Sequence, residues 1–325
     1  MEKAGAPCFP VRLFLGEELS ARGFFSHGFL SRAEFLAILE REGRSGDLRE
    51  YLGDGFGGLA AVALRYGEGE YGLPGWASGH RADPSTVQLS LGRFCRADWY
   101  GEILQRLRLA AAAGVSRAAA AGVILPPARM WKRLANSRLP EKSLALAAGL
   151  GFLGRNSILI ARRRIGEGPS YSSAVVLGFL LCPEGLDFEA PEKAGAGAPE
   201  VQPGCGSCSR CIAACPTGAL GEGGGFIREK CIQHWTSRDE SPPGEVADAR
   251  GLRLYGCDSC LEACPYFLTD PGAQAGSGRL GPGIPVPYFL ASTPEKIQAD
   301  LKGSALGPRW ISKKSFKRFA EGFKA

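Results

Sequence analysis

The residues of this 325-residue chain most able to do chemistry are eight cysteines arranged in two runs. The first run has the spacing C-x₂-C-x₂-C-x₃-C-P and is formed by Cys205, Cys208, Cys211 and Cys215. The second run has Cys231 at its head and continues, after a gap wide enough for a helix, with Cys257, Cys260 and Cys264. A cubane cluster needs four thiolates that converge on its iron corners, and short gaps let one loop supply three of them. The two runs therefore predict two [4Fe–4S] clusters and a protein that handles electrons.

The ligand sets follow from the bacterial two-cluster pattern, in which the last cysteine of a run crosses to the other cluster. One cluster is expected to bind Cys205, Cys208, Cys211 and Cys264. The other is expected to bind Cys215, Cys231, Cys257 and Cys260. The second run departs from the simple pattern because Cys231 lies far ahead of Cys257, with the Gln-His-Trp sequence at 233–235 in the gap.

Two alternatives to the clusters are weaker. Paired C-x₂-C motifs also suit structural zinc, but zinc ribbons do not usually have the longer run found here. A disulfide scaffold fits poorly with a chain that lacks a secretory signal. The isolated Cys8, Cys95 and Cys182 have apolar or aromatic sequence neighbours and are expected to be small buried hydrophobes.

The rest of the chain has the composition of a globular protein, with 45% hydrophobic and 22% charged residues. Its length suggests about two domains. No apolar run reaches the roughly 18 residues of a membrane span, so no membrane partner is expected. The start at Met1 lacks the apolar core of a signal peptide, which predicts a cytoplasmic protein whose thiolates stay reduced.

Hydrophobic patterning predicts an α/β (α+β) domain over residues 1–190 and a bacterial ferredoxin-like domain with both clusters over 200–270. A Gly/Pro-rich loop over 271–290 and a short basic helix complete the chain over 271–325. Within the first domain, helices are expected near 32–42, 99–113 and 140–148, and strands near 59–66, 157–161 and 173–181. Residues 183–204 are expected to form an exposed connector, and short helices are expected after Cys208 and Cys260.

The final segment combines aromatic and basic residues. Phe316, Phe319 and Phe323 share one face of a helix, and lysines and an arginine surround them. Either the phenylalanines dock on the body and the charges are only solvated, or the basic face also meets a phosphate backbone. The net charge of +6 permits a nucleic-acid partner without requiring one.

Two stretches match the dinucleotide pattern G-x-G-x-x-G, at residues 53–58 and 149–154. A dinucleotide fingerprint follows a strand and begins a helix, whereas both stretches are expected to precede strands. The chain is therefore not expected to use NADPH directly, and an external low-potential electron donor is implied. In the second stretch, the glycines are expected to let the backbone approach a large flat ligand.

The double cysteine run, together with the segment from Glu141 to Ile160 that contains GLGFLGRNS at 149–157, resembles the epoxyqueuosine reductase family. Residues 92–100 are similar to that family's Asp-Tyr-His helix start. Residues 215–219 and 255–260 fit its two cluster loops. The resemblance covers roughly residues 90–270 and is looser at both ends.

The resemblance implies a cobalamin in the N-terminal domain and a ferredoxin-like domain that delivers single electrons to it. Such enzymes reduce the epoxide of epoxyqueuosine in tRNA to the alkene of queuosine, so tRNA would be the macromolecular partner. The hard chemistry belongs to the cofactor. The cofactor-binding residues that the resemblance implies are Gly151, Gly154, Arg155, Asn156, Ser157 and His234.

One position departs from the family's pattern. The family has an aspartate, thought to donate a proton, six residues before the glutamate that aligns with Glu141, and this chain has Ala135 there. The next residue, Asn136, has an amide that is not an acid. Glu141 and His234 are alternative proton sources, although His234 is better explained as a polar surface or packing residue beside a cluster. No catalytic residue is therefore assigned.

The departure leaves three functions open. The chain is expected to be an epoxyqueuosine reductase with another proton source, or a divergent paralogue, a corrinoid reductase that acts on a different substrate. From a different class, a non-catalytic electron-transfer protein would have the same two clusters without cobalamin. The sequence leaves the oligomeric state open.

Overall fold

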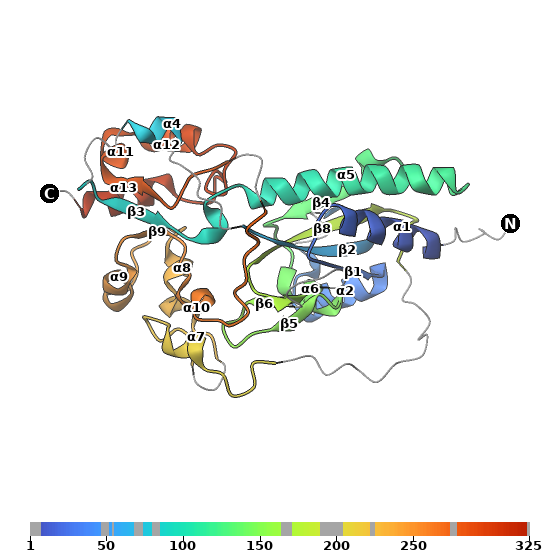
Figure 1. The fold of residues 1–325 in the computed structure, drawn as a ribbon, viewed down its shortest axis with the longest axis horizontal. Helices are drawn as coiled ribbons and strands as arrows, with labels where there is room; N and C mark the ends of the chain where they lie inside the picture. The colour runs from blue at the N-terminus through green and yellow to red at the C-terminus, as the bar shows by residue number, and fades with distance from the viewer. Residues whose placement is uncertain are drawn as a thin grey trace. The chain divides into compact units, whose positions relative to one another are not determined.

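A computed structural model describes residues 8–46, 52–53, 55–67, 74–79, 85–163, 171–188, 204–221, 225–273 and 278–323. The chain divides into two compact units, whose elements are traced in Figure 1. The sheet unit comprises residues 1–65, 103–154 and 158–206. The cluster unit comprises residues 66–102, 155–157 and 207–325. Neither unit is a continuous stretch of sequence.

The helices and strands of the sheet unit are α1 (Cys8–Ala21), β1 (Ser26–Leu30), α2 (Arg32–Arg41), β2 (Phe56–Arg65), β4 (Lys132–Ala135), α6 (Glu141–Ala147), β5 (Gly151–Leu153), β6 (Leu159–Arg162), β7 (Tyr171–Ser172) and β8 (Val175–Pro183). The helix α5 (Trp99–Ala120) belongs to this unit from Ile103 onward. A short 3₁₀ turn spans Ala128–Met130.

The sheet unit is built on a four-stranded antiparallel sheet in the order β1-β2-β8-β4. Nine successive residues of β2, from Phe56 to Leu64, are buried. On one face of the sheet, α2 and α6 share a core with β2. On the other face, Ile103 of α5 comes so close to Gly178 that a Cβ there would lie 2.3 Å from it. Because helices cover both faces, β2 is a continuous apolar run and does not alternate.

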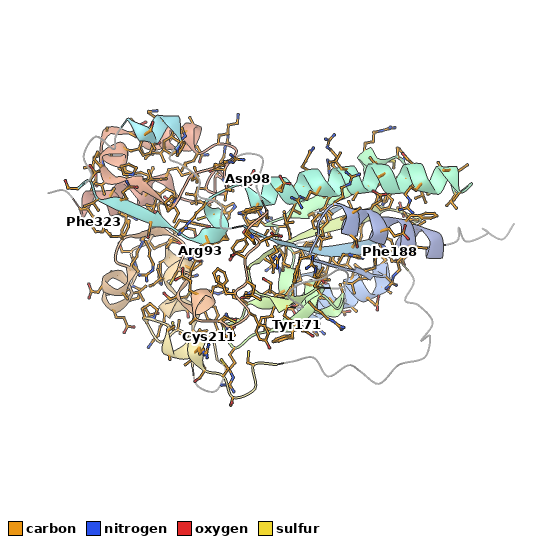
Figure 2. The ribbon with its side chains drawn as sticks, in the orientation of Figure 1. Arg93, Asp98, Tyr171, Phe188, Cys211 and Phe323 are labelled. Atoms are coloured by element: carbon orange, nitrogen blue, oxygen red, sulfur yellow. The ribbon has the colours of Figure 1, made fainter. Side chains whose placement is uncertain are left out.

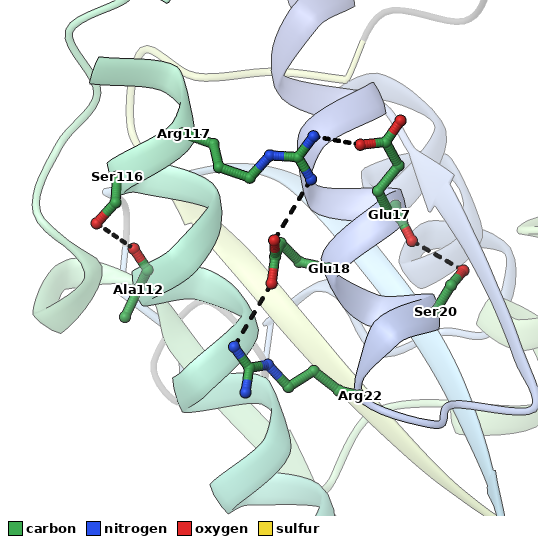
Figure 3. A network of polar contacts seen from close by, with 8 residues as sticks. Glu17, Glu18, Ser20, Arg22, Ala112, Ser116 and Arg117 are labelled. Carbon is green, nitrogen blue, oxygen red and sulfur yellow. Dashed lines mark hydrogen bonds and ion pairs between the residues drawn. The ribbon is translucent and has the colours of Figure 1, made fainter. Parts of the chain in front are cut away.

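Ion pairs join α1 to α5 at the surface of the sheet unit (Figure 3). Arg117 donates hydrogen bonds to both Glu17 and Glu18, and Glu18 also pairs with Arg22 at 3.5 Å. Exposed ion pairs of this kind contribute little to stability. The burial of Leu15 on α1, which has 1% of its surface exposed, therefore matters more for holding the two helices together.

The helices and strands of the cluster unit are α4 (Gly75–Ser78), β3 (Gln88–Leu91), α7 (Arg210–Ala213), α8 (Ile232–Trp235), α9 (Gly244–Arg250), β9 (Arg253–Tyr255), α10 (Ser259–Glu262), β10 (Gly283–Pro285), α11 (Val286–Ala291), α12 (Pro294–Asp300) and α13 (Lys313–Glu321). Short 3₁₀ turns span Arg93–Cys95 and Arg228–Lys230.

A three-stranded sheet explains why residues 66–102 belong to the cluster unit. Its middle strand β3 pairs antiparallel with β10 and parallel with β9, both of which come much later in the sequence. The domain division expected from sequence, at 190 and 200, assigns all of 66–102 to the first domain. The structure differs because β3 is only four residues long and its partners cannot be recognised from local pattern.

Most elements expected from the sequence are present. The expected helices correspond to α2, α5 and α6, and the expected strands to β2, β6 and β8, with α5 extending further, to Ala120. Short helices also occur at the cysteine loops, as α7 and α10. Within the expected connector, residues 189–203 lie outside the described residues. Among the helices that the structure describes, none is both long and apolar enough to cross a bilayer.

The expectation of a loop over residues 271–290 is wrong in its last part, where β10 and α11 form. Pro285 is tolerated because β10 lies at an edge of its sheet. Pro287 is tolerated because it lies in the first turn of α11, where a backbone N–H has no partner within the helix. Composition alone favoured a loop, and tertiary pairing with β3 overrode it.

The C-terminal helix α13 docks on the cluster unit through its phenylalanines, as both sequence alternatives predicted. Phe316 is fully buried, and its ring centroid lies 6.3 Å from that of Phe289. The guanidinium of Arg250 lies 3.7 Å from the centroid of the Phe319 ring. Figure 2 labels Phe323, whose ring contacts Phe319 with centroids 5.3 Å apart.

Two of the basic side chains of α13 are used inside the unit. Lys313 is buried and donates hydrogen bonds to the carbonyls of Pro308 and Ile311. Lys317 donates to the carbonyl of Ser292 at 2.8 Å. These charges therefore satisfy backbone carbonyls, and a large basic face does not remain on this helix.

Candidate functional site

The cysteines of the two runs gather at two short helices of the cluster unit. Cys211 lies on α7 and Cys260 on α10, and these two helices pack against each other. Figure 2 labels Cys211 among the side chains of this region. None of the eight cysteines of the runs forms a disulfide. The disulfide alternative is therefore not supported.

The pKa shifts of two cysteines indicate that five of the thiols are neighbours. Burial, followed by the neighbouring thiols of Cys257, Cys231, Cys215 and Cys211, raises the pKa of Cys260 to about 12. Burial is also the first cause that raises the pKa of Cys231, again with Cys257 and Cys215 contributing. Four of these five residues form the second predicted ligand set. Thiolates this close repel one another, and a positively charged iron core between them removes that repulsion.

Backbone N–H groups also point at the sulfurs. Burial acts to raise the pKa of Cys215, but hydrogen bonds from the backbone of Thr217, Ala219 and Leu220 outweigh it, so the pKa lies below its usual value. The sulfur of Cys231 accepts in the same way from the backbone of Gln233 and His234. Such donors stabilise thiolate charge and, around a cluster, tune its reduction potential.

Zinc and a cubane cluster require different arrangements of their cysteine ligands. Among the described residues, no group of three or more Cys, His, Asp or Glu side chains is arranged to hold one metal ion. A zinc ion holds its four thiolates close around a single centre. A cubane cluster places four irons and four sulfides between its ligands, which keeps the thiolates further apart.

A loop from early in the sequence supports the second cysteine run. The backbone N–H of Arg93 donates a 2.7 Å hydrogen bond to Asp258, between Cys257 and Cys260. Gly92 and Gly256 touch backbone to backbone, and a Cβ on Gly256 would lie 2.7 Å from the Gly92 Cα. Gly256 also has a φ of +95°, so glycine is required there on two grounds.

Behind this loop lie three buried polar atoms that have no hydrogen-bond partner. They are the Tyr66 hydroxyl, the Trp99 indole nitrogen and the Oδ1 oxygen of Asp258. The rings of Tyr66 and Trp99 have centroids 6.4 Å apart, and burial followed by the charge of Asp258 raises the pKa of Tyr66. Buried polar atoms without partners are costly, so such a group indicates a missing polar ligand.

The glycine-rich stretch predicted to approach a flat ligand has a structural role at Gly151. A Cβ on Gly151 would lie 2.0 Å from the Ile160 carbonyl, so the missing side chain makes room for the pairing of β5 with β6. Gly154 begins the turn of this hairpin and donates its N–H to Ile158 at 2.9 Å. At Gly151, the space that we expected a cofactor to use is taken by Ile160 of β6.

The tip of the same hairpin, residues 155–157, is counted with the cluster unit. Asn156 is buried, and its amide donates a 3.4 Å hydrogen bond to the carbonyl of Cys260. Ser157 has a φ of +58°, a conformation that the tight turn imposes. Arg155 is half-buried. Asn156 is thus tied to a cluster loop, and its predicted contact with a cofactor stays a prediction.

The two alternative proton sources have different surroundings. His234 on α8 is half-buried, its ring meets Trp235 edge-on, and burial followed by Arg238 and Arg228 lowers its pKa. Glu141 accepts hydrogen bonds from the Ser137 N–H at 2.7 Å and its hydroxyl at 3.0 Å. Burial nevertheless raises the pKa of Glu141, which therefore keeps a proton to higher pH than an ordinary glutamate.

Ala135 is the last residue of β4 and pairs with Gly178 on β8. The chain then turns sharply at Asn136, whose φ is +49°. The turn places Ser137 within hydrogen-bond reach of Glu141. The carboxyl group connected to this turn is therefore that of Glu141.

Sequence reasoning missed Tyr66, Trp99 and Asp258 as possible ligand contacts. Trp99 and Asp258 lie inside segments quoted for the family resemblance, but nothing in their types indicates unsatisfied hydrogen bonding. Tyr66 closes an apolar strand and carries no signal at all. Cys95 and Cys182 are buried, as expected of small hydrophobes, and Cys95 donates to the Gly92 carbonyl at 3.0 Å.

Comparisons with known proteins agree with this site. A family model described as a 4Fe-4S double cluster binding domain matches residues 204–266. The chain is 32% identical over 178 residues to an epoxyqueuosine reductase of Bacillus anthracis, covering 54% of this chain and 41% of that relative. The match thus spans about two fifths of the relative's length. The predicted resemblance to the family and the presence of a double-cluster iron–sulfur domain are confirmed.

Solved structures extend the likeness to the whole fold. The epoxyqueuosine reductase of Streptococcus thermophilus has a TM-score of 0.67 at 20% identity, covering 95% of this chain and 79% of that one. An epoxyqueuosine reductase with a modified tRNA stem loop has a TM-score of 0.68 at 21% identity, covering 97% of this chain and 80% of that one. At this identity the likeness establishes the mixed α/β fold.

Replacing single cysteines tests the ligand sets. We expect Cys260→Ser and Cys208→Ser each to lower the iron content of the reconstituted protein from about eight to about four atoms per chain, because each removes one cluster. The EPR spectrum of the reduced protein should keep the signal of the other cluster. Cys182→Ala, in the sheet unit, is the control and should keep all the iron. Equal loss of both clusters in both variants would contradict the assignment.

Proposed function

We propose, from the premise that this chain is related in sequence to the epoxyqueuosine reductases and shares their fold, that it is a cobalamin-dependent iron–sulfur reductase. Its substrate is epoxyqueuosine in tRNA and its product is queuosine. The observation that carries the proposal is the mutual electrostatic influence of neighbouring cysteine thiols in a double-cluster domain. The fold shared with epoxyqueuosine reductases supports it.

The clusters are assigned to the two sets predicted from spacing. The mutual electrostatic effects of Cys215, Cys231, Cys257 and Cys260 support one set directly. The other set, with Cys205, Cys208, Cys211 and Cys264, rests on the spacing of the first run. Each cluster carries one electron at a time. Reduction of an epoxide to an alkene and water requires two electrons and two protons, so the external donor must supply two electrons per turnover.

The electrons come from a separate donor. The stretch at 149–154 connects α6 to β5, and so does not follow a strand and begin a helix. The stretch at 53–58 leads into β2. Neither has the setting of a dinucleotide site. An external low-potential reductant or electron-transfer protein therefore fills the clusters.

The polar atoms without partners are the groups that would hold a corrinoid. The Tyr66 hydroxyl and the Trp99 indole would donate to its amide oxygens, and the Oδ1 oxygen of Asp258 would accept from an amide N–H. When bound, a reduced corrinoid supplies a strongly reducing cobalt centre for the carbon skeleton of the substrate. The sequence-predicted residues, Gly154 to Ser157 and His234, remain second candidates for this contact.

Glu141 is the better supported of the two proton sources. Its raised pKa keeps the acid form present toward neutral pH, and Ser137 fixes the direction of its carboxyl group. The lowered pKa of His234 leaves little of its acid form at neutral pH. Glu141 would therefore take the place of the aspartate that Ala135 has replaced.

The substrate assignment is tested in a strain that lacks its own epoxyqueuosine reductase. Expression of this chain should convert the epoxyqueuosine of its tRNA to queuosine, measured by mass spectrometry of tRNA nucleosides. A Cys260→Ser variant, which lacks one cluster, is the inactive control. If the cluster-loaded wild type leaves epoxyqueuosine untouched, the substrate assignment is wrong.

The corrinoid site is tested by binding alone. Tyr66→Phe removes one donor, and we expect the affinity for cob(II)alamin to fall about fivefold, as for the loss of one hydrogen bond of about 1 kcal/mol. Tyr288→Phe is the control, because its hydroxyl donates to Asp300 within the same unit at 2.9 Å. Absorption and EPR titration of the iron-loaded protein measures the affinity. No binding by the wild type would favour the electron-transfer alternative.

The proton source is tested by the pH dependence of the reaction. A donor must be protonated, so activity that depends on Glu141 is present below its raised pKa and is lost as the pH rises through that value. Glu141→Gln should lower the rate at acidic pH and remove this loss. Glu141→Asp should keep the pH dependence at a reduced rate. An unchanged pH profile in Glu141→Gln would assign the proton to another group.

A further inference from the structure

The cluster unit has an open hollow of about 890 Å³ that none of its cysteines lines. It is formed by the segment after α8, the start of α12 and the segment leading into α13. Its lining is rich in charged residues and has one large aromatic ring. The lining residues that carry the argument are Arg238, Asp239, Glu240, Glu295, Arg309, Trp310 and Lys314.

Of the four cations that line this hollow, only Lys313 donates a side-chain hydrogen bond to another described residue. The side chains of Arg238 and Arg309 are exposed and make no hydrogen bond or ion pair with the residues that the structure describes. Lys314 is also exposed and acts only on Glu295, whose pKa it helps to lower. Lys313 and Lys317 of the same segment, by contrast, bind backbone carbonyls. Three exposed cations, Arg238, Arg309 and Lys314, are therefore available to a ligand at the hollow.

Trp310 is the aromatic residue of the hollow, and 56% of its surface is exposed. The next residue, Ile311, is buried with 1% exposed, so the chain at this point is anchored in the core. An anchored segment that presents an indole ring to solvent beside two free arginines provides a surface on which a base can stack.

Three acidic residues also line the hollow, and two of them have hydrogen-bond partners within the protein. Asp239 accepts a 2.6 Å hydrogen bond from the Ser312 hydroxyl and lies 3.9 Å from Arg318. Glu295 is bonded first to its own backbone N–H and then to the Thr293 hydroxyl, which lowers its pKa. Glu240 alone has neither a hydrogen bond nor an ion pair with a described residue. It would repel an anion, which gives a direct test.

We propose that this hollow binds an unpaired nucleotide of the tRNA substrate, with its base on Trp310 and its phosphate between Arg238, Arg309 and Lys314. The proposal rests on the proposed function, because that function supplies the RNA. Stacking requires a base that is not already paired, which favours a single-stranded loop or end over a duplex. Phosphate contacts to free cations supply affinity that falls with salt.

The test is fluorescence anisotropy of a labelled tRNA anticodon stem loop with the iron-loaded full chain, over a range of salt concentrations. Trp310→Ala should weaken binding about tenfold through lost stacking, and Trp310→Phe should restore most of it. Arg309→Ala should weaken binding and reduce the slope of log affinity against log salt by about one. Glu240→Gln should tighten binding.

Lys302→Ala is the matched control, because Lys302 is exposed and lies outside the hollow. Wild type that binds the RNA and makes queuosine, with Trp310→Ala and Arg309→Ala binding no worse than Lys302→Ala, would overturn the proposal and leave the proposed function intact. Failure of the wild type both to bind RNA and to make queuosine would instead reject the proposed function. Competition by a free mononucleotide as effective as that by unlabelled RNA would overturn the assignment to a strand.

Discussion

Mutual repulsion among neighbouring cysteine thiolates is the constraint on which the cluster unit depends. Burial and neighbouring thiols raise the pKa of Cys260 to about 12, which disfavours the ionised form that binds iron. An iron–sulfur core reverses this, since its positive iron stabilises each thiolate. Backbone N–H groups aimed at Cys215 and Cys231 act in the same direction. We therefore expect metal binding and folding of these loops to be linked.

The second cysteine run is held by a segment that is distant in sequence. The close approach of Gly92 to Gly256, and the hydrogen bond from Arg93 to Asp258, fix the loop between Cys257 and Cys260. The same docking buries Tyr66 and Trp99 and leaves their polar atoms without partners. Support of the second cysteine run and the group of polar atoms without partners thus lie in one packed region of the cluster unit.

Some basic side chains of the cluster unit stabilise its fold, and others are exposed and available to a ligand. Lys313 and Lys317 donate to backbone carbonyls, and Arg250 lies on the Phe319 ring, so these cations hold α13 in place. Three other exposed cations, Arg238, Arg309 and Lys314, line the same hollow as the exposed Trp310. A basic tail in sequence therefore becomes a docked helix with a local basic hollow beside it. The distinction matters for RNA binding, because only cations that are free to contact phosphate release counterions.

The sequence by itself determined the two clusters, the family resemblance and the helices and strands with strong periodicity, because cysteine spacing and hydrophobic pattern are local properties. It also placed the phenylalanine face of α13 correctly. Only the tertiary structure decided that residues 66–102 join the cluster unit and that Gly151 accommodates a neighbouring strand. It alone decided that Asn156 binds the carbonyl of Cys260 and that three polar atoms are left without partners. These features depend on which distant segments meet, and a four-residue strand such as β3 has too few side chains to specify its partners locally.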